Sequence, residues 1–298
     1  MKKQIIAILC IAFVWVGCKE NNSSVDFGHT GISDTTYVLA TTSIPALQPH
    51  NVLADEFTGQ SCANCPQAAG ILETASNTNP NRVNIISRYF YSGGSAYSPV
   101  GGSIHDLRDS LDILVDDQIY AGIAATSIPG GGIDRTPISG SMYTAKEAWT
   151  TAIINQLTIV DSVNIDVSTS YNAVTNLDTI VVKVTYVYGI ATPQNLSVEV
   201  VEDSIYDKQL SSTDTIPNYL FMNVFRGSVT PEPTGTPIGT DRPIKEQGRV
   251  YQKVFTYTPK TITPAIIPKH CRVVAYVNNP GTGGDYRVIQ SVQAPLRH

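Results

Sequence analysis

Residues 51–75 read NVLADEFTGQSCANCPQAAGILETA, and no other stretch of this chain is as informative. Its beginning, Asn51 to Phe57, has the composition of a strand, and a short polar loop separates it from Cys62. From Cys62 onward, small and aliphatic residues recur at helical spacing until the breaker cluster at 77–80. The sequence therefore predicts a strand, a loop and a helix whose first turn carries Cys62 and Cys65.

The placement of the two cysteines favours redox chemistry. Unpaired backbone N–H groups and the positive end of the helix dipole stabilise a thiolate, which lowers the pKa of the first cysteine. We therefore expect Cys62 to attack and Cys65 to resolve the mixed disulfide. Pro66 fits this position, because the opening turn of a helix does not use its N–H. The chemistry requires that the Cys62 sulfur be reachable.

The residues that follow extend this pattern. We expect a strand over 82–90, an inserted amphipathic helix or pair of helices over 104–120, a strand over 132–135 after Ile128-Pro129, and a closing helix over 144–157.

This order of elements resembles the thioredoxin fold. In that family the proline before the third strand is cis and lies against the cysteine pair, and Pro129 is the matching position. The family also keeps a buried carboxylate six residues before the first cysteine, where this chain has Glu56. The resemblance implies that Glu56 relays a proton to or from Cys65, with a pKa raised toward neutrality by burial. Asp55, on the opposite strand face, is expected to be solvated.

Residues 55–66 narrow the resemblance to the outer membrane protein twenty-eight family of bacterial lipoproteins. In that family a thioredoxin-like domain precedes a β-rich domain. This chain departs from reducing thioredoxins in having Ala63-Asn64 between the cysteines in place of Gly-Pro, and in having no Trp before Cys62. Both departures change the redox poise.

The second half has the period of β-strands. Apolar and polar residues alternate from Asp161, and turn clusters separate short strands, which indicates an antiparallel β-sandwich of immunoglobulin-like architecture. Further strands are expected over 179–187, 196–201, 249–257, 271–277 and 286–292. Residues 227–248 are rich in Pro, Thr and Gly and are predicted to form a long exposed loop of the kind that binds partners.

The N-terminus reads as an export signal. Lys2 and Lys3 precede an apolar run over 5–16 that is too short to span a bilayer but typical of a signal peptide, assigned to 1–17. The run ends in a segment that resembles the lipobox of bacterial lipoproteins, with Cys18 as the lipidated residue and Trp15 at a usually aliphatic position. Ordinary secretion, with Cys18 discarded or left free, is the alternative.

The predicted organisation has three parts after the signal peptide. A lipidated flexible tether over 18–45 leads to an α/β thioredoxin-like domain with a helical insertion over 46–159, and an all-β immunoglobulin-like sandwich follows over 160–298. The lipid is expected to hold the protein at the outer membrane, on a face that the sequence does not give.

The composition of the chain excludes several classes of protein and of binding site. The chain has 298 residues, 42% of them hydrophobic, and a net charge of -5, which indicates a folded protein and makes nucleic acid an unlikely partner. No cofactor or metal is predicted, because one Cys-x-x-Cys supplies two of four zinc ligands and the histidines show no ligand spacing. Cys271 is expected to be a buried thiol.

Two functions follow. The first is thiol–disulfide exchange with protein or peptide thiols and disulfides, carried by Cys62, Cys65, Glu56 and Pro129. The second is a surface binding or adhesion lipoprotein in which the disulfide is structural. Independently of the function, the alternatives for Glu56 and Pro129 are an ordinary exposed strand carboxylate and a trans turn proline. The sequence alone does not separate them.

Overall fold

The computed structural model describes residues 33–91, 94–124, 127–231 and 233–297. The predicted signal peptide and the lipobox with Cys18 therefore lie outside the described residues. The helices are α1 (Cys65–Thr78), α2 (Asp112–Ile119) and α3 (Trp149–Gln156), with 3₁₀ turns at Thr41–Ser43, Ser95–Tyr97, Lys146–Ala148, Pro268–His270 and Thr282–Gly284. The strands are β1 (Thr35–Val38), β2 (Val52–Phe57), β3 (Val83–Arg88), β4 (Gly130–Ile133), β5 (Thr144–Ala145), β6 (Val163–Asn172), β7 (Leu177–Tyr186), β8 (Gln194–Glu202), β9 (Ile205–Leu210), β10 (Thr215–Phe221), β11 (Val224–Ser228), β12 (Thr236–Ile238), β13 (Arg249–Tyr257), β14 (Cys271–Asn278) and β15 (Val288–Pro295).

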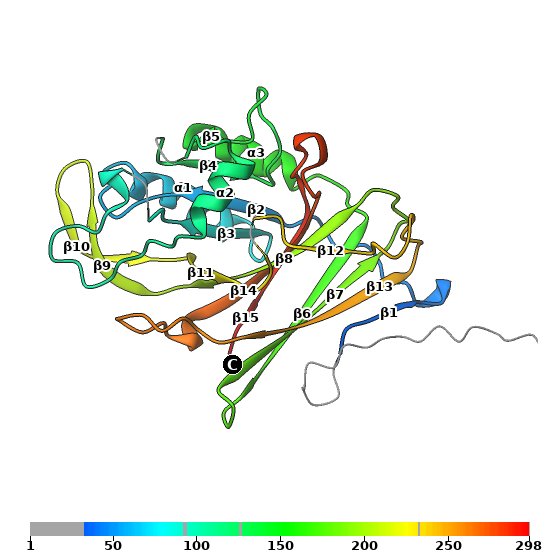
Figure 1. Ribbon diagram of the computed structural model, residues 1–298. Helices are drawn as coiled ribbons and strands as arrows, with labels where there is room; N and C mark the ends of the chain where they lie inside the picture. The colour runs from blue at the N-terminus through cyan, green and yellow to red at the C-terminus, as the bar shows by residue number, and fades with distance from the viewer. Residues whose placement is uncertain (1–32, 92–93, 125–126, 232, 298) are drawn as a thin grey trace, which may run out of the picture.

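The protein is mostly β, and one mixed sheet runs through it (Figure 1). Its order is β15-β14-β8-β11-β3-β2-β4-β5, and β12 also pairs with β8. β2 is parallel to β3 and antiparallel to β4. β11 joins β3 in parallel at Val224 and Ser87, and it pairs with β8 along its other edge. A strand of the second half is therefore hydrogen-bonded to a strand of the first.

A second sheet, in the order β1-β13-β7-β6, is antiparallel throughout. Its apolar side chains pack against those of β8 and β14 in one core, as in a β-sandwich. This core includes Val163, Ile165, Val182, Val184, Val198, Val200, Val273 and Ala275.

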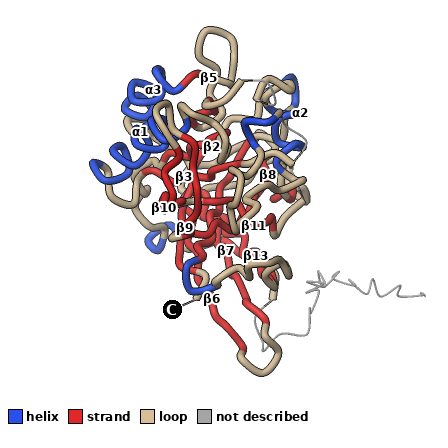
Figure 2. The backbone as a smooth tube through the Cα atoms, turned by 90° about the vertical axis from the view of Figure 1, so that its left-hand side faces the viewer, coloured by secondary structure: helices blue, strands red, loops and turns tan. Residues whose placement is uncertain are grey.

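Helices cover both faces of the large sheet around β2. α1 and α3 lie together on one side, while α2 lies on the other (Figure 2). Because strand side chains alternate, Val52 and Ala54 face α1 and α3, whereas Leu53 and Phe57 belong to clusters on the opposite side. Glu56 is in register with Ala54 and so faces α1. Within the described residues, none of the helices has the length and apolar character that crossing a membrane requires.

Four predicted segments differ from the structure. The closing helix expected over 144–157 forms only over 149–156, because residues 144–145 pair with β4 as strand β5. The helix expected over 104–120 forms only over 112–119, because tertiary hydrogen bonds hold the preceding residues extended: Asp207 accepts the backbone N–H of Ile104, and Tyr89 accepts that of Asp109. Part of the predicted tether is a strand, since β1 adds to the edge of β13. Residues 227–248 are not simply an exposed loop, because β12 pairs with β8 and buries Ile238.

Candidate active site beside the Cys62–Cys65 disulfide

Cys62 and Cys65 form a disulfide at the start of α1. Cys65 is the first residue of the helix, whereas Cys62 lies in the turn before it, where its carbonyl accepts the N–H of Cys65 at 3.2 Å. The expectation that Cys62 belongs to the first helical turn is therefore wrong by three residues. The physical reason is that the first helical bond runs from Ala68 N–H to the carbonyl of Asn64, which makes Asn64 the cap.

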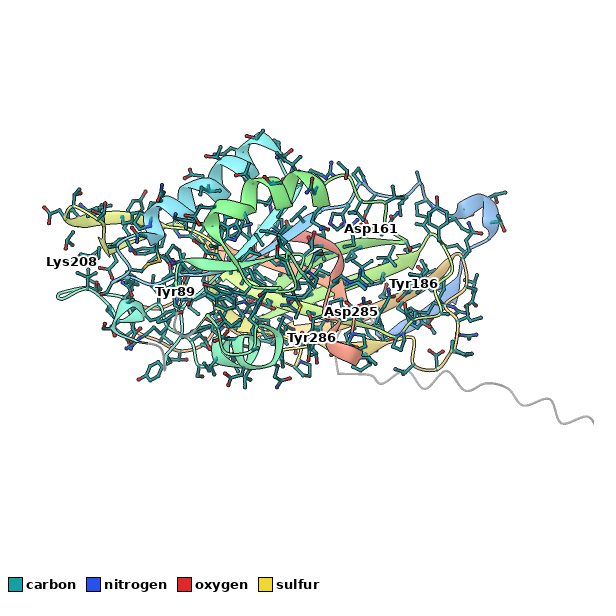
Figure 3. All side chains as sticks on the ribbon, turned by 90° about the horizontal axis from the view of Figure 1, so that it is seen from above. Tyr89, Asp161, Tyr186, Lys208, Asp285 and Tyr286 are labelled. Atoms are coloured by element: carbon teal, nitrogen blue, oxygen red, sulfur yellow. A yellow bond between two sulfur atoms is a disulfide. The ribbon has the colours of Figure 1, made fainter. Side chains whose placement is uncertain are left out.

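A hairpin from the second half covers the disulfide. The hairpin is β9 and β10, and Lys208 on β9 lies toward one end of the molecule (Figure 3). The side-chain amide of Gln209 donates to the carbonyls of Gly59 at 3.2 Å and Cys62 at 3.1 Å. Cys62 is 5% exposed and Cys65 2%. The predicted redox chemistry requires a Cys62 sulfur that a substrate can reach. While the hairpin covers the disulfide, this sulfur is not accessible.

Glu56 is buried beneath α1, so the alternative of an ordinary exposed carboxylate is wrong. Its Oε2 accepts a hydrogen bond from the Ser87 hydroxyl at 2.6 Å, while its Oε1 has no hydrogen-bond partner among the described residues. Burial raises the pKa of Glu56 to about 7, and the Ser87 hydrogen bond opposes this only in part. Near neutral pH this carboxyl can therefore give or take a proton.

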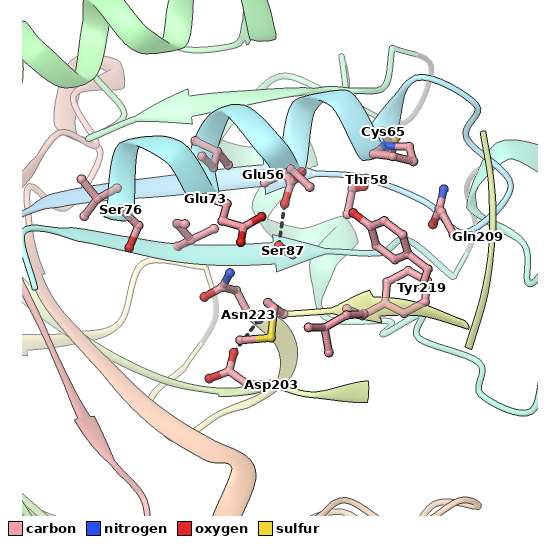
Figure 4. Close-up of a pocket in the computed structure, with 18 of the residues that line it drawn as sticks. Glu56, Thr58, Cys65, Glu73, Ser76, Ser87, Asp203, Gln209, Tyr219 and Asn223 are labelled. Carbon is pink, nitrogen blue, oxygen red and sulfur yellow. Dashed lines mark hydrogen bonds between the residues drawn. The ribbon is translucent and has the colours of Figure 1, made fainter. Parts of the chain in front are cut away.

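Glu56 and Cys65 both line one pocket of about 350 Å³. The pocket lies between α1 and the segment formed by β10 and the turn into β11, with β3 as its floor (Figure 4). Glu56 points into it from β2, and Tyr219 closes the end nearest Cys65 (Figure 4). The sequence does not predict that the second half builds this wall.

The structure confirms two smaller predictions. The Ile128–Pro129 peptide bond, which leads directly into β4, is cis. Cys271 is a free thiol, buried on β14, and burial raises its pKa to about 12.

Asp55 is not solvated, contrary to the sequence prediction. It lies on the opposite face of β2 from Glu56, but that face is covered, and its carboxylate binds Arg88 at 3.0 Å and Arg135 at 2.9 Å. Burial alone would raise the pKa of Asp55, but Arg135 and Arg88 outweigh it and hold the pKa at about 2. This carboxylate is a structural ion-pair partner.

His50 is a second buried ionic centre that the sequence did not reveal. Its ring nitrogens bond to Asp134 at 2.8 Å and Asp161 at 2.7 Å. Burial acts to lower the pKa of His50, but the hydrogen bonds and charges of the two aspartates raise it to about 10. Across the part of the chain that the structure describes, no three His, Cys, Asp or Glu side chains form a group suited to a metal ion.

Comparison with known proteins gives a likeness at the level of fold. No family model matches the chain, and no curated protein matches it. The solved structure of HBP35 of Porphyromonas gingivalis aligns with a TM-score of 0.62 at 16% identity, covering 83% of this chain and 76% of that one. A protein from Agrobacterium tumefaciens aligns with a TM-score of 0.49 at 10% identity, covering 83% of this chain and 95% of that one. This chain therefore shares its overall fold with HBP35 of Porphyromonas gingivalis.

Proposed function

We propose that this protein catalyses thiol–disulfide exchange, with Cys62 and Cys65 as the redox pair and Glu56 as the proton carrier. One observation carries the proposal: a buried carboxyl with a pKa of about 7 lines the same pocket as Cys65. A buried carboxyl without a charged partner is costly, and such perturbed groups cluster at functional sites. Its position six residues before Cys62 matches the resemblance to thioredoxin-like proteins.

The reaction starts from the disulfide. A thiolate of a substrate dithiol attacks Cys62 Sγ, the Cys62–Cys65 bond breaks, and Cys65 leaves as a thiolate that takes a proton from Glu56. The second substrate thiolate then attacks the substrate sulfur of the mixed disulfide and releases Cys62. Two electrons pass from the substrate dithiol to the cysteine pair, and the substrate leaves as a disulfide. Exchange in the opposite direction uses the same steps reversed.

The proposal extends to fold, family and location. We propose that residues 46–159 have a thioredoxin-like fold and residues 160–298 an immunoglobulin-like sandwich fold, that the two share one interior, and that the chain belongs to the outer membrane protein twenty-eight family. Lipidation of Cys18 would anchor the chain to the outer membrane, with the lipid as its membrane contact. The similarity of this fold to that of HBP35 of Porphyromonas gingivalis supports the proposal that this chain is a bacterial envelope protein.

Equilibration of the full chain with glutathione redox buffers tests the exchange. We expect the pair to titrate within about -270 to -120 mV, the range of known oxidoreductases. Cys62→Ser should abolish turnover with the fold intact, whereas Cys271→Ser, the matched removal of a thiol outside the pair, should retain it. A disulfide that stays closed below about -300 mV would contradict the proposal.

The burial of both cysteines favours a second candidate function, a binding or adhesion lipoprotein in which the disulfide is structural. Under this alternative the disulfide only fixes the start of α1. Resistance to glutathione, together with unchanged partner binding after Cys62→Ser and Cys65→Ser, would support it.

A further inference from the structure

The pocket beside the disulfide is lined by more acidic than basic side chains. Three carboxyl groups line it, those of Glu56, Glu73 and Asp203, against one guanidinium, that of Arg272. Asp203 and Arg272 pair with each other at 2.6 Å. Among the described residues, no cationic side chain forms an ion pair with either of the remaining carboxyls, Glu56 from β2 and Glu73 from α1. Both are directed into the pocket (Figure 4).

The second independent feature is the orphaned oxygen of Glu56. Its side chain is buried and points into the pocket, but Oε1 has no hydrogen-bond partner in the described structure. A buried polar atom without a partner destabilises a fold, and native proteins rarely leave one unless a ligand or water meets it. Glu56 therefore presents an acceptor to whatever enters.

Aromatic rings line the same pocket. Tyr219 and Phe221 meet edge to face with centroids 4.8 Å apart, and Tyr89 meets Phe221 at 6.4 Å. Burial, followed by the charges of Glu56 and Glu73, raises the pKa of Tyr219 to about 12, so its phenol stays neutral. Neutral aromatic faces beside carboxylates attract organic cations through their ring quadrupoles.

We infer that this pocket binds an organic cation with an apolar stem, a guanidinium or alkylammonium group such as an arginine or lysine side chain. The head would lie between Glu56 and Glu73, and the stem along the aliphatic walls that Leu72 and Ile85 provide. Exposed Leu220 and Met222 line the same pocket and suit the adjoining backbone of a polypeptide. The inference does not depend on redox turnover; if exchange also occurs, the pocket favours substrates with a basic residue near the reacting cysteine.

Calorimetric titration of the oxidised full chain at pH 8 tests the site. The probes are Nα-acetyl-arginine amide and its neutral isostere Nα-acetyl-citrulline amide, and we expect the cation to bind at least about 10-fold more tightly, since charge-assisted bonds to carboxylates are the stronger ones. An Ala-Arg-Ala tripeptide amide shows whether the site recognises the basic side chain alone or the side chain within a polypeptide. Equal affinity assigns the site to the side chain alone, and tighter binding assigns it to polypeptides.

Variants locate the site. Glu73→Gln and Glu56→Gln should each weaken arginine-amide binding by about 5-fold to 10-fold, while Asp117→Asn, the same charge change on the exposed face of α2, should have no effect. Circular dichroism confirms the fold of each variant, and Glu73, being exposed, gives a test even where Glu56→Gln unfolds the chain.

The pH dependence of arginine-amide binding provides a further test of the role of Glu56. The groups that face Glu56 are Ser87 on β3, Tyr89 just after β3, Tyr219 on β10 and Glu73 on α1. Binding should tighten from pH 6 to pH 8 as Glu56 ionises, and Glu56→Gln should remove this change. Equal binding of the citrulline probe, absence of binding up to about 10 mM, or affinity unchanged in both pocket variants would overturn the inference. Exchange with glutathione, measured separately, decides the proposed function.

Discussion

At the scale of single residues, β2 places two neighbouring carboxyls in opposite environments. Asp55 meets two guanidiniums, which stabilise its charge, whereas Glu56 meets a hydroxyl and no cation. The pKa of one is therefore lowered to about 2 and that of the other raised to about 7. Strand alternation predicts that the two face opposite sides, but only the tertiary structure supplies the arginines.

The raised pKa of Glu56 has a consequence for stability. A carboxyl whose folded pKa lies above its unfolded value stabilises the fold while protonated, so this contribution is present below pH 4.5 and is lost as pH rises to about 7. The free energy of unfolding of the wild type should therefore fall relative to Glu56→Gln across this range, by up to about 3 kcal/mol. Urea unfolding at several pH values measures the difference.

Ser87→Ala and Asp117→Asn provide the matched comparisons for this prediction. Ser87→Ala removes the one hydrogen bond that lowers the pKa of Glu56, so the titration should move to higher pH. Asp117→Asn removes a charge at an exposed position outside the pocket and should keep the wild-type dependence. Parallel curves for the wild type and Glu56→Gln would mean that Glu56 is not desolvated.

The folded pKa of His50 is also raised, but here the protonated form that the fold stabilises is the charged one. Because its folded pKa of about 10 lies above the usual 6.5, the stability that it contributes is present below pH 6.5 and is lost only as pH rises through about 10. Nitrogen NMR should therefore find both ring nitrogens protonated at pH 8. Asp161→Asn should move the titration toward neutrality, and a wild-type midpoint near 6.5 would show that the two aspartates do not hold the charge.

At the scale of elements, the sequence predicts those that carry an apolar period. The strand–helix–strand unit around Cys65 has one, and so do six strands of the sandwich, and each lies within a few residues of its expected range. These six strands are β6, β7, β8, β13, β14 and β15. β9 could not be found in this way, because its buried positions include Asp207 and Gln209 while Tyr206 faces solvent. Of its three inward side chains only Ile205 packs in an apolar cluster, while Asp207 and Gln209 bond to loops, so β9 lacks the alternating apolar pattern that identifies a strand.

The residues of the candidate site also divide into those that the sequence predicts and those that only the tertiary structure brings to it. Cys62, Cys65 and Glu56 are recognisable by their spacing, and Pro129 by its place before an expected strand, because the sequence resembles thioredoxin-like proteins at these positions. The opposite pocket wall, with Tyr219 on β10 and Asn223 in the turn into β11, lies more than a hundred residues away along the chain, and no local pattern predicts such a contact.

The hairpin should control access to the disulfide. Gln209 connects β9 to Gly59 and Cys62, so Gln209→Ala should loosen the cover and speed reduction by dithiothreitol by about 10-fold, the value of one or two hydrogen bonds. Tyr206→Ala is the control, because Tyr206 is exposed on the same strand. Quenched-flow alkylation of the released thiols measures the rate. Equal rates in the two variants would show that reduction does not need hairpin movement.

At the scale of the whole molecule, the two halves share one interior. Arg88 on β3 binds Asp55 within the first half and Glu199 on β8 in the second, the latter at 2.8 Å. Leu53 and Ile86 pack in one cluster with Val201, Phe225, Val274, Tyr276 and Val288. The boundary predicted at residue 160 marks a change of sequence period, yet strands from both sides of it join one sheet.

This shared interior predicts that residues 46–159 do not fold alone. Separation would expose Leu53 and Ile86 to water and leave the Arg88 side chain without Glu199, and breaking a buried ion pair of this kind costs about 3–5 kcal/mol, a large part of a domain's stability. The full chain should unfold in one calorimetric transition, and the fragment alone should show none. Mixing it with a fragment of residues 160–298 is the control, because the two together should regain the transition. A fragment with its own cooperative Tm near that of the full chain would instead make β3 and β11 the interface between two independently stable domains.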